Sequence, residues 1–186
     1  MNPAAHPAVR VRLRPTRPAD LPYVLRLEHD PSNLPAVLPW ELAQHEAALR
    51  FPDFRHFMLE AGPGLEPAGF VILSGCRSPH QTIELKRLVS HHKGLGHGRA
   101  ALRLVKQLVF DDLQAHRLWF EVRERSVATR TLAESEGFVL EGRLRDAVRT
   151  VADVDADAPA RESLLLLSML TAECGTRRAQ RLELLG

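Results

Sequence analysis

The sequence predicts an α/β fold in which a mixed central sheet of about six to seven strands is flanked by helices. Strand and helix patterns alternate through the middle of the chain, and strand patterns prevail towards both ends. A length of 186 residues suits a single domain. We expect one domain over residues 1–186, with its core over about 10–172 and a C-terminal tail over 173–186.

The N-terminal half is expected to hold three short strands and two helices. Apolar and basic side chains alternate from Val9 to Arg14, which is typical of a half-buried strand. Asp20 is a suitable N-cap for a helix with Pro22 in its first turn. Prolines recur through residues 31–39 and predict a loop there. The full prediction is strands at Val9–Arg14, His56–Glu60 and Ala68–Ser74, and helices at Pro22–Asp30 and Trp40–Leu49.

The C-terminal half is expected to continue the sheet around two more helices. The first follows a glycine-rich turn and has one apolar face, because Ala101, Leu104, Val105 and Leu108 recur at helical spacing. The second ends at Gly137, a suitable C-cap. Strands are expected at Ile83–Val89, Leu118–Val122, Phe138–Leu140 and Ser163–Leu170, the second helix at Ser126–Glu136, and an exposed loop at Val151–Ala160.

Composition excludes several classes of function. A formal net charge of +2 is far below the excess of a general nucleic-acid binder, so a nucleic-acid partner is not expected. The longest apolar run, Leu164 to Leu170, is too short for a membrane span. The N-terminus resembles no export signal. Two isolated cysteines, Cys76 and Cys174, are typical of reduced thiols, and we expect a cytoplasmic protein.

One segment carries a chemical signal. The strand around Ile83–Val89 leads into the glycine turn Lys93–Arg99, which opens a helix, so unpaired backbone N–H groups should converge at one point and bind phosphate. Residues 82–106 also carry six basic side chains and one acidic side chain. A tight turn beside a solvated basic helix face is the alternative interpretation. Neither the Rossmann pattern nor the P-loop pattern fits these residues.

The turn resembles the acyl-coenzyme A pyrophosphate loop of the GNAT family of N-acetyltransferases, with Lys93 at the basic position and Gly96 and Gly98 at the glycine positions. The resemblance covers roughly residues 10–172 and points to the ribosomal-protein and spermidine-type subgroup. Its further segments are Ala115–Val122, Leu132–Phe138, Glu141–Arg145 and Leu164–Leu170.

The resemblance implies an enzyme that transfers the acetyl group of acetyl-CoA to a primary amine, by direct transfer in a ternary complex and without a metal. A protein N-terminus, a polyamine and a small amine all stay open as acceptor, and so does a homodimer. A catalytically degenerate acyl-CoA-binding or sensing module is the alternative function. The implied cofactor-binding residues are Leu88, Val89, Lys93, Gly94, Leu95, Gly96, His97, Gly98, Arg99 and Ser126.

Two carboxylates are candidate general bases. The resemblance places Glu121 where some ribosomal-protein acetyltransferases carry a catalytic Glu, and Glu84 where histone-type relatives carry theirs. For either one, an ion pair with Arg87 or Arg123 is the alternative role. Backbone N–H groups around Leu88 and Val89 are expected to bind the oxyanion.

The chain departs from the family pattern at three positions. Ser126 replaces an Asn, Thr129 replaces an Ala, and Ala133 replaces the Tyr that protonates the departing thiolate. Water, the Ser126 hydroxyl or the single tyrosine, Tyr23, could replace that acid, and we favour water.

Other sequence signals are weaker. Trp40 and Phe51, near Glu28 and His29, are candidates for an acceptor pocket, with core packing as the alternative. No metal is expected at the loop histidines His91, His92 and His97 or at the Asp153–Asp157 repeat, because the ligand spacing is wrong.

Overall fold

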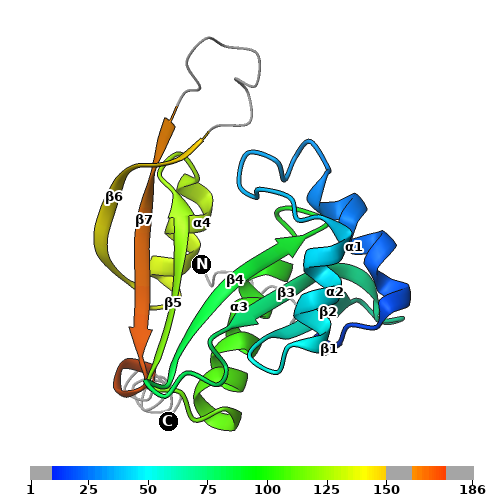
Figure 1. Cartoon of the computed structure of the whole chain (residues 1–186), viewed down its shortest axis with the longest axis horizontal. Coiled ribbons are helices and arrows are strands. Elements are labelled where there is room, and N and C mark those ends of the chain that lie inside the picture. Colours follow the sequence, from blue (N-terminus) through cyan, green and yellow to red (C-terminus); the bar gives the residue numbers. More distant parts are fainter. Residues whose placement is uncertain (1–9, 150–160, 175–186) are drawn as a thin grey trace, which may run out of the picture.

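The computed structural model describes residues 10–149 and 161–174, and these form one seven-stranded sheet with helices on both faces (Figure 1). The fold class expected from the sequence is confirmed. The strands are β1 Val11–Pro15, β2 Arg55–Ala61, β3 Glu66–Ser74, β4 Thr82–Ser90, β5 Arg117–Arg123, β6 Val139–Arg149 and β7 Arg161–Leu170. The helices are η1 Pro18–Asp20, α1 Leu21–Glu28, α2 Leu42–Arg50, α3 His97–Gln107, η2 Leu108–Asp112 and α4 Val127–Ser135.

The sheet consists of two antiparallel groups joined by one parallel pair. Its strand order is β1-β2-β3-β4-β5-β7-β6. Strands β1 to β4 form an antiparallel group, and β5, β7 and β6 form another. Strand β4 pairs with β5 in parallel, and α3 lies in the connection between them. This junction brings the end of β4, the start of α3 and the end of β5 into one region.

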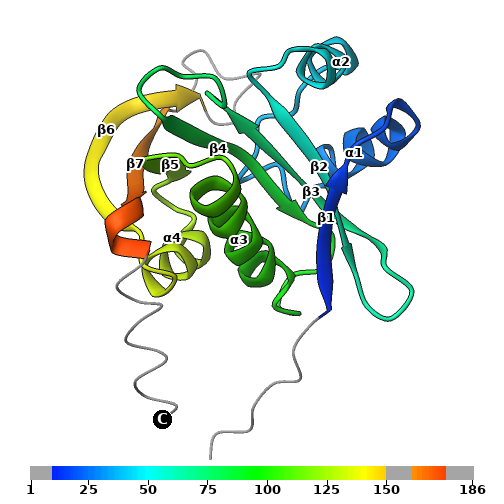
Figure 2. The same cartoon turned by 90° about the horizontal axis from the view of Figure 1, so that it is seen from below.

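The helices divide between the two faces of the sheet (Figure 2). Helices α3 and α4 cover one face, whereas α1 and α2 cover the other. Strand β3 follows the period of two that this arrangement requires, because Val71 and Leu73 pack into the α3 side while Phe70 and Ile72 pack under α1. Both faces of β3 are therefore buried.

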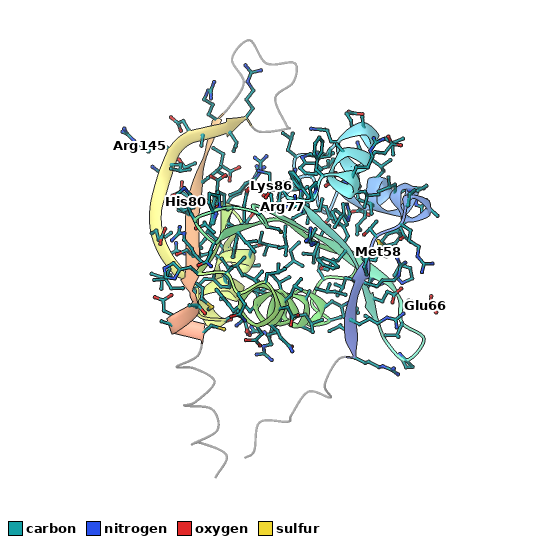
Figure 3. The ribbon with its side chains drawn as sticks, turned by 60° about the horizontal axis from the view of Figure 1, so that its bottom comes forward. Met58, Glu66, Arg77, His80, Lys86 and Arg145 are labelled. Carbon is teal, nitrogen blue, oxygen red and sulfur yellow. The ribbon has the colours of Figure 1, made fainter. Side chains whose placement is uncertain are left out.

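Strand β6 differs most from the prediction. A strand was expected only at Phe138–Leu140, but β6 extends from Val139 to Arg149 and pairs with β7 through two register shifts. The alternation of apolar and polar residues on which such a prediction depends is missing, because almost every residue of this edge strand is exposed. Arg145, for example, points away from the molecule (Figure 3).

The remaining differences lie at element ends. Helix α2 begins at Leu42 rather than Trp40, with Glu41 as N-cap and its N–H bonded to Gln44 Oε1 at 2.8 Å. The helix after the glycine turn passes into a π-helical turn at Leu108. The expected loop at residues 151–160 and the tail beyond residue 174 lie outside the described residues. Within the described ranges, no helix is long and apolar enough to cross a membrane.

Candidate functional site

Strands β4 and β5 pair over three residues and then separate. Thr82, Ile83 and Glu84 lie opposite Arg117, Leu118 and Trp119. Beyond this point a cavity of about 800 Å³ opens between the two strands. The ends of β4 and β5, the glycine turn, the start of α3, α4 and part of the loop at residues 29–41 line it. A parallel pair that opens in this way makes a binding site in the middle of the sheet.

A β-bulge at Lys86 shapes the β4 wall of the cavity. Leu73 lies opposite Leu85, and its neighbour Ile72 lies opposite Arg87, so Lys86 is the extra residue. The bulge changes which residues face each side of the sheet: Leu85 packs with the α3 side, whereas Val89 packs with the α1 side. Lys86 itself lies in the middle of the molecule, between the β5–β7 group and the part that carries α1 and α2 (Figure 3).

The two predicted oxyanion donors, Leu88 and Val89, point their N–H groups to opposite edges of β4. The N–H of His91 bonds to Ala68 O at 2.8 Å, which fixes the phase of the β3–β4 ladder. Antiparallel strands alternate between bonded and non-bonded pairs, so the N–H of Val89 points to β3 and that of Leu88 points to the β5 side. Leu88, which lines the cavity, is therefore the better candidate donor.

The glycine turn brings backbone N–H groups to one end of the cavity. Gly94 and Gly96 have φ of 80° and 78°, which a residue with a side chain rarely adopts. Gly96 is the N-cap of α3, and the N–H of Ala100 is bonded to its carbonyl at 3.0 Å. The N–H groups of the three residues between them precede the first helical hydrogen bond and lie at the positive end of the helix. A pyrophosphate fits this arrangement.

His97, the first residue of α3, adds a polar atom to this end of the cavity. Its Nδ1 is buried and has no hydrogen bond to any described residue. Burial, with a further contribution from His92, lowers the pKa of His97, so its imidazole is neutral near pH 7. The ring can therefore donate or accept one hydrogen bond to a bound ligand.

The basic side chains around the turn have partners that are distant in the sequence. Arg99, Arg103 and Lys106 all contact the carboxylate of Glu136, at 2.7, 2.8 and 3.1 Å. Burial alone would raise the pKa of Glu136, but the hydrogen bonds from these three groups outweigh it and lower that pKa to about 2. The interpretation of this face as simply solvated is wrong. The groups at this end of the cavity that remain without a partner include backbone N–H groups at the start of α3.

The basic side chains at the end of β4 and in the turn after it also have partners. Lys86 pairs with Glu84 at 3.0 Å, and Arg87 pairs with Glu28 at 3.3 Å. Lys93 donates to Asn33 Oδ1 and to Ser90 O, and burial lowers the pKa of its ammonium. Lys93 thus holds the turn against the loop at residues 29–41 while also lining the cavity.

The two candidate bases have different surroundings. Glu121 lines the cavity and has no hydrogen bond or ion pair with the described residues. Burial raises the pKa of Glu121, the negative charge of Glu84 raises it further, and Lys86 opposes the shift. Glu84 accepts hydrogen bonds from Ser74 Oγ at 2.9 Å and Lys86 Nζ at 3.0 Å, and it is not among the lining residues.

The proposed arginine partners of these two carboxylates are engaged elsewhere. Arg87 pairs with Glu28, and Arg123 pairs with Glu162 at 3.1 Å. Glu121 therefore remains available to accept a proton.

Helix α4 forms another wall of the cavity. Ser126 is its N-cap, and Ser126, Thr129 and Ala133 all line the cavity. The helix ends as expected at Gly137, whose φ is 101°, with the N–H of Phe138 bonded to Ala133 O at 3.0 Å. Ala133 brings a methyl group where the family pattern has a Tyr. Tyr23 is not a lining residue and packs edge-on against His91.

Sequence reasoning predicted a loop at residues 31–39 but not that it would line the cavity; we call residues 29–41 the acceptor-side loop. Ser32, Pro35, Ala36 and Val37 line the cavity. Arg125 Nη2, two residues beyond the end of β5, donates to Pro35 O at 3.2 Å and so links the loop to the β5 side of the cavity. The prolines in this segment indicated a loop but gave no sign of what it would cover.

The two aromatic candidates for the acceptor pocket lie elsewhere. Trp40 packs against Phe54 and under the guanidinium of Arg87, 5.0 Å from its ring centroid. Phe51 is 61% exposed and lines a separate hollow of about 210 Å³. Of the two roles considered, core packing is correct for Trp40, and neither residue lines the large cavity.

Among residues 10–149 and 161–174, no group of three His, Cys, Asp or Glu side chains could bind a metal ion together. His91 and His92 stack on each other with ring centroids 4.3 Å apart. The Asp153–Asp157 repeat lies outside the described residues.

Comparison with known proteins links this geometry to one family. The model of the acetyltransferase (GNAT) domain matches residues 10–139. The fold is similar to that of a mutant form of the spermidine/spermine N-acetyltransferase SpeG from Vibrio cholerae, with 19% identity, a TM-score of 0.76, and coverage of 90% of this chain and 98% of that one. A complex of the Vibrio cholerae spermidine N-acetyltransferase with CoA and spermine also has 19% identity and a TM-score of 0.76, with coverage of 88% and 97%.

A third solved structure, described as a putative acetyltransferase, has 27% identity and a TM-score of 0.69, and the alignment covers 94% of this chain and 92% of that one. No curated protein matches the sequence.

Proposed function

Because the chain belongs to the GNAT acetyltransferase family, we propose that it transfers the acetyl group of acetyl-CoA directly to a primary amine in a ternary complex, with Glu121 accepting the amine proton. The enzyme class and the co-substrate follow from the family. The identity of the base, the direct route and the nature of the acceptor are the proposal.

One observation carries it. Glu121, a carboxylate without a partner among the described residues, lies in the same cavity as the free N–H groups at the start of α3. Phosphate bound at α3 would anchor the cofactor on the side of the sheet covered by α3 and α4. An acceptor would then approach from the side of the acceptor-side loop and meet the thioester where β4 and β5 separate.

Glu121 suits the role of base. Only a neutral amine attacks a thioester, so the ammonium form must lose a proton within the site or through a held water. Glu121 is solvent-exposed within the cavity, and its raised pKa makes its carboxylate a better proton acceptor than one with the ordinary pKa. Attack forms the new C–N bond. The C–S bond breaks when the tetrahedral oxyanion collapses and the thiolate leaves, and the nitrogen gives its second proton to water.

Two further groups serve that intermediate. The N–H of Leu88 points to the open side of β4 and can donate to the oxyanion. Ala133 supplies no acid, so water or the Ser126 hydroxyl protonates the departing thiolate. A thiol is far more acidic than an alcohol, so this step needs little assistance.

The direct route is supported by the cysteines. Neither Cys76 nor Cys174 lines the cavity. Burial raises the pKa of Cys76 to about 11, so it is a poor nucleophile near pH 7. The reduced thiol of Cys76 also suits a cytoplasmic location.

The rival function is an acyl-CoA-binding or sensing module, which the residues at positions 126 and 133 suggested. Glu121 counts against it, because a sensor needs no available base beside the thioester. RNA binding through the basic stretch is disfavoured further, since carboxylates compensate those cations.

The test is turnover by the full chain with acetyl-CoA and three classes of acceptor: a peptide N-terminus, spermidine and a small primary amine. We expect CoA release with at least one acceptor and intersecting initial-velocity lines. Tight CoA binding with no acetylation of any acceptor would favour the sensing module. Parallel lines would contradict direct transfer.

A further inference from the structure

A chain of buried polar residues runs through the core between α1, α2 and the sheet. The side chains of Glu28 and His45 are 0% exposed. They lie beside an apolar cluster that includes Val24, Met58 and Phe70. Burying a carboxylate in such surroundings is costly unless it is paired and hydrogen-bonded.

The contacts form one continuous path. Glu28 Oε2 accepts the N–H of Trp40 at 2.7 Å and lies 3.3 Å from His45 Nε2. His45 Nδ1 is 3.2 Å from His56 Nε2, and His56 Nδ1 is 2.9 Å from Thr16 Oγ1. On the other side, Glu28 Oε1 accepts from Arg87 Nε at 3.3 Å.

The carboxylate fixes the first hydrogen bond of this path. An ionised Glu28 can only accept, so His45 donates to it from Nε2. The remaining ring nitrogens carry the path on from His45 to His56 and Thr16. Burial and the neighbouring His45 lower the pKa of His56 to about 4. Burial also opposes ionisation of Glu28, but hydrogen bonds from His45 and Trp40 keep its pKa below the ordinary value.

The path ends at the cavity, in Arg87. Its guanidinium donates to Lys86 O at 2.9 Å and to Leu38 O at 2.9 Å. Lys86 is the bulge residue of β4, and Leu38 belongs to the acceptor-side loop. One side chain therefore ties the loop that covers the acceptor side to the bulge that precedes Leu88.

We propose that Glu28 and Arg87, with His45 behind them, are positioning residues for acetyl transfer that fix the acceptor-side loop and the β4 bulge relative to each other. The inference rests on the proposed function. A well-packed apolar set could fill this volume at no greater cost in stability. The polar path instead ends on two backbone carbonyls, that of Lys86, which lines the cavity, and that of Leu38, the residue after the lining residue Val37. A displacement of about 1 Å at such a wall can reduce turnover about 10²-fold.

The test compares Glu28→Gln with Glu60→Gln. Glu60 is a matched control, because it is 6% exposed, accepts from Arg12 and Arg14 at 2.6 Å each, and lies on β2 outside the cavity lining. For both variants we would measure kcat and KM for the amine, the CoA Kd and the Tm. Glu28→Gln should lower kcat/KM for the amine about 10- to 100-fold with the CoA Kd changed less than about threefold. Glu60→Gln should lower only the Tm.

A second variant tests the inference even if Glu28→Gln does not fold. Arg87→Lys keeps a cation for Glu28 but cannot reach both carbonyls, so it should show the same loss in kcat/KM. Wild-type kinetics in either folded variant, with a lower Tm alone, would overturn the inference and leave the proposed function standing. A wild-type chain that binds CoA but acetylates no amine would overturn both.

Discussion

The proposed cofactor side and the proposed acceptor side of the cavity are built by different means. On the proposed cofactor side, the consecutive residues His97, Gly98 and Arg99 present backbone N–H groups at the start of α3. On the acceptor side, the wall combines the acceptor-side loop with side chains from β4 and β5, and Arg87 holds it to Glu28, 59 residues away. A backbone site needs a local sequence pattern, whereas a side-chain site needs the whole fold to assemble it.

The largest effect should come from a side chain at Gly98. A Cβ there would meet only Leu132 Cδ2, at 3.7 Å, so Gly98→Val should fold. Its branched side chain would occupy the space that phosphates need near the helix N-terminus. We expect CoA binding to fall below detection by calorimetry, and acetyl transfer to be lost with it.

Gly142→Val is the control for this variant. Gly142 lies on the exposed strand β6, and a Cβ there meets nothing within 4 Å. Its CoA affinity should equal that of the wild type. Unchanged CoA affinity in folded Gly98→Val would remove the distinction between the two sides, because the turn would then not be the cofactor site.

Loss of the Glu136 charge should affect stability rather than catalysis. Glu136→Gln removes the carboxylate that accepts from Arg99, Arg103 and Lys106, and we expect a loss of about 2 kcal/mol in the free energy of unfolding. The pKa of Glu136 is lowered in the fold, so its contribution is full above pH 4.5 and is lost as the pH falls towards about 2.

Urea titrations at pH 7 and pH 3 would check this, because the difference between wild type and variant should shrink at the lower pH. A fall in CoA affinity in Glu136→Gln would contradict the account, since the variant frees cations rather than removing them.

Removing the negative or the positive neighbour of Glu121 should shift the pH dependence of turnover in opposite directions. Activity should rise with pH as Glu121 loses its proton. Glu84→Gln removes a negative neighbour and should shift this acid limb to lower pH, whereas Lys86→Met removes a positive one and should shift it to higher pH. The limb is read from kcat/KM for the amine across the pH range. If Glu84 is the base instead, Glu84→Gln should abolish the limb.

The smallest effects are expected from variants that test the missing general acid. Tyr23→Phe should leave kcat within about threefold of the wild type, less than about 0.7 kcal/mol of barrier, because Tyr23 does not line the cavity. Ala133→Tyr should retain or raise activity, since that position does line it. A loss of about 10²-fold in Tyr23→Phe would show that the acid comes from α1.

The same contrast explains what the sequence could predict. The strands follow from apolar residues at every second position, and the helices follow from apolar residues three or four positions apart. The glycine turn follows from the spacing of its glycines. Strand β6 did not, because an exposed edge strand lacks alternation. The pairing of Arg99, Arg103 and Lys106 with Glu136 links residues 30 to 37 positions apart, and no local pattern records it. The acceptor-side loop, predicted as irregular, acquires its role only from what it covers.

The central claim is that proton transfer to Glu121 occurs in the cavity where β4 and β5 separate. The most direct test is the pH profile of kcat for Glu121→Gln beside the wild type, with the CoA Kd measured in parallel. The account predicts a rate about 10²- to 10⁴-fold lower, no acid limb and an unchanged Kd. A variant with wild-type kcat and the same acid limb would contradict it.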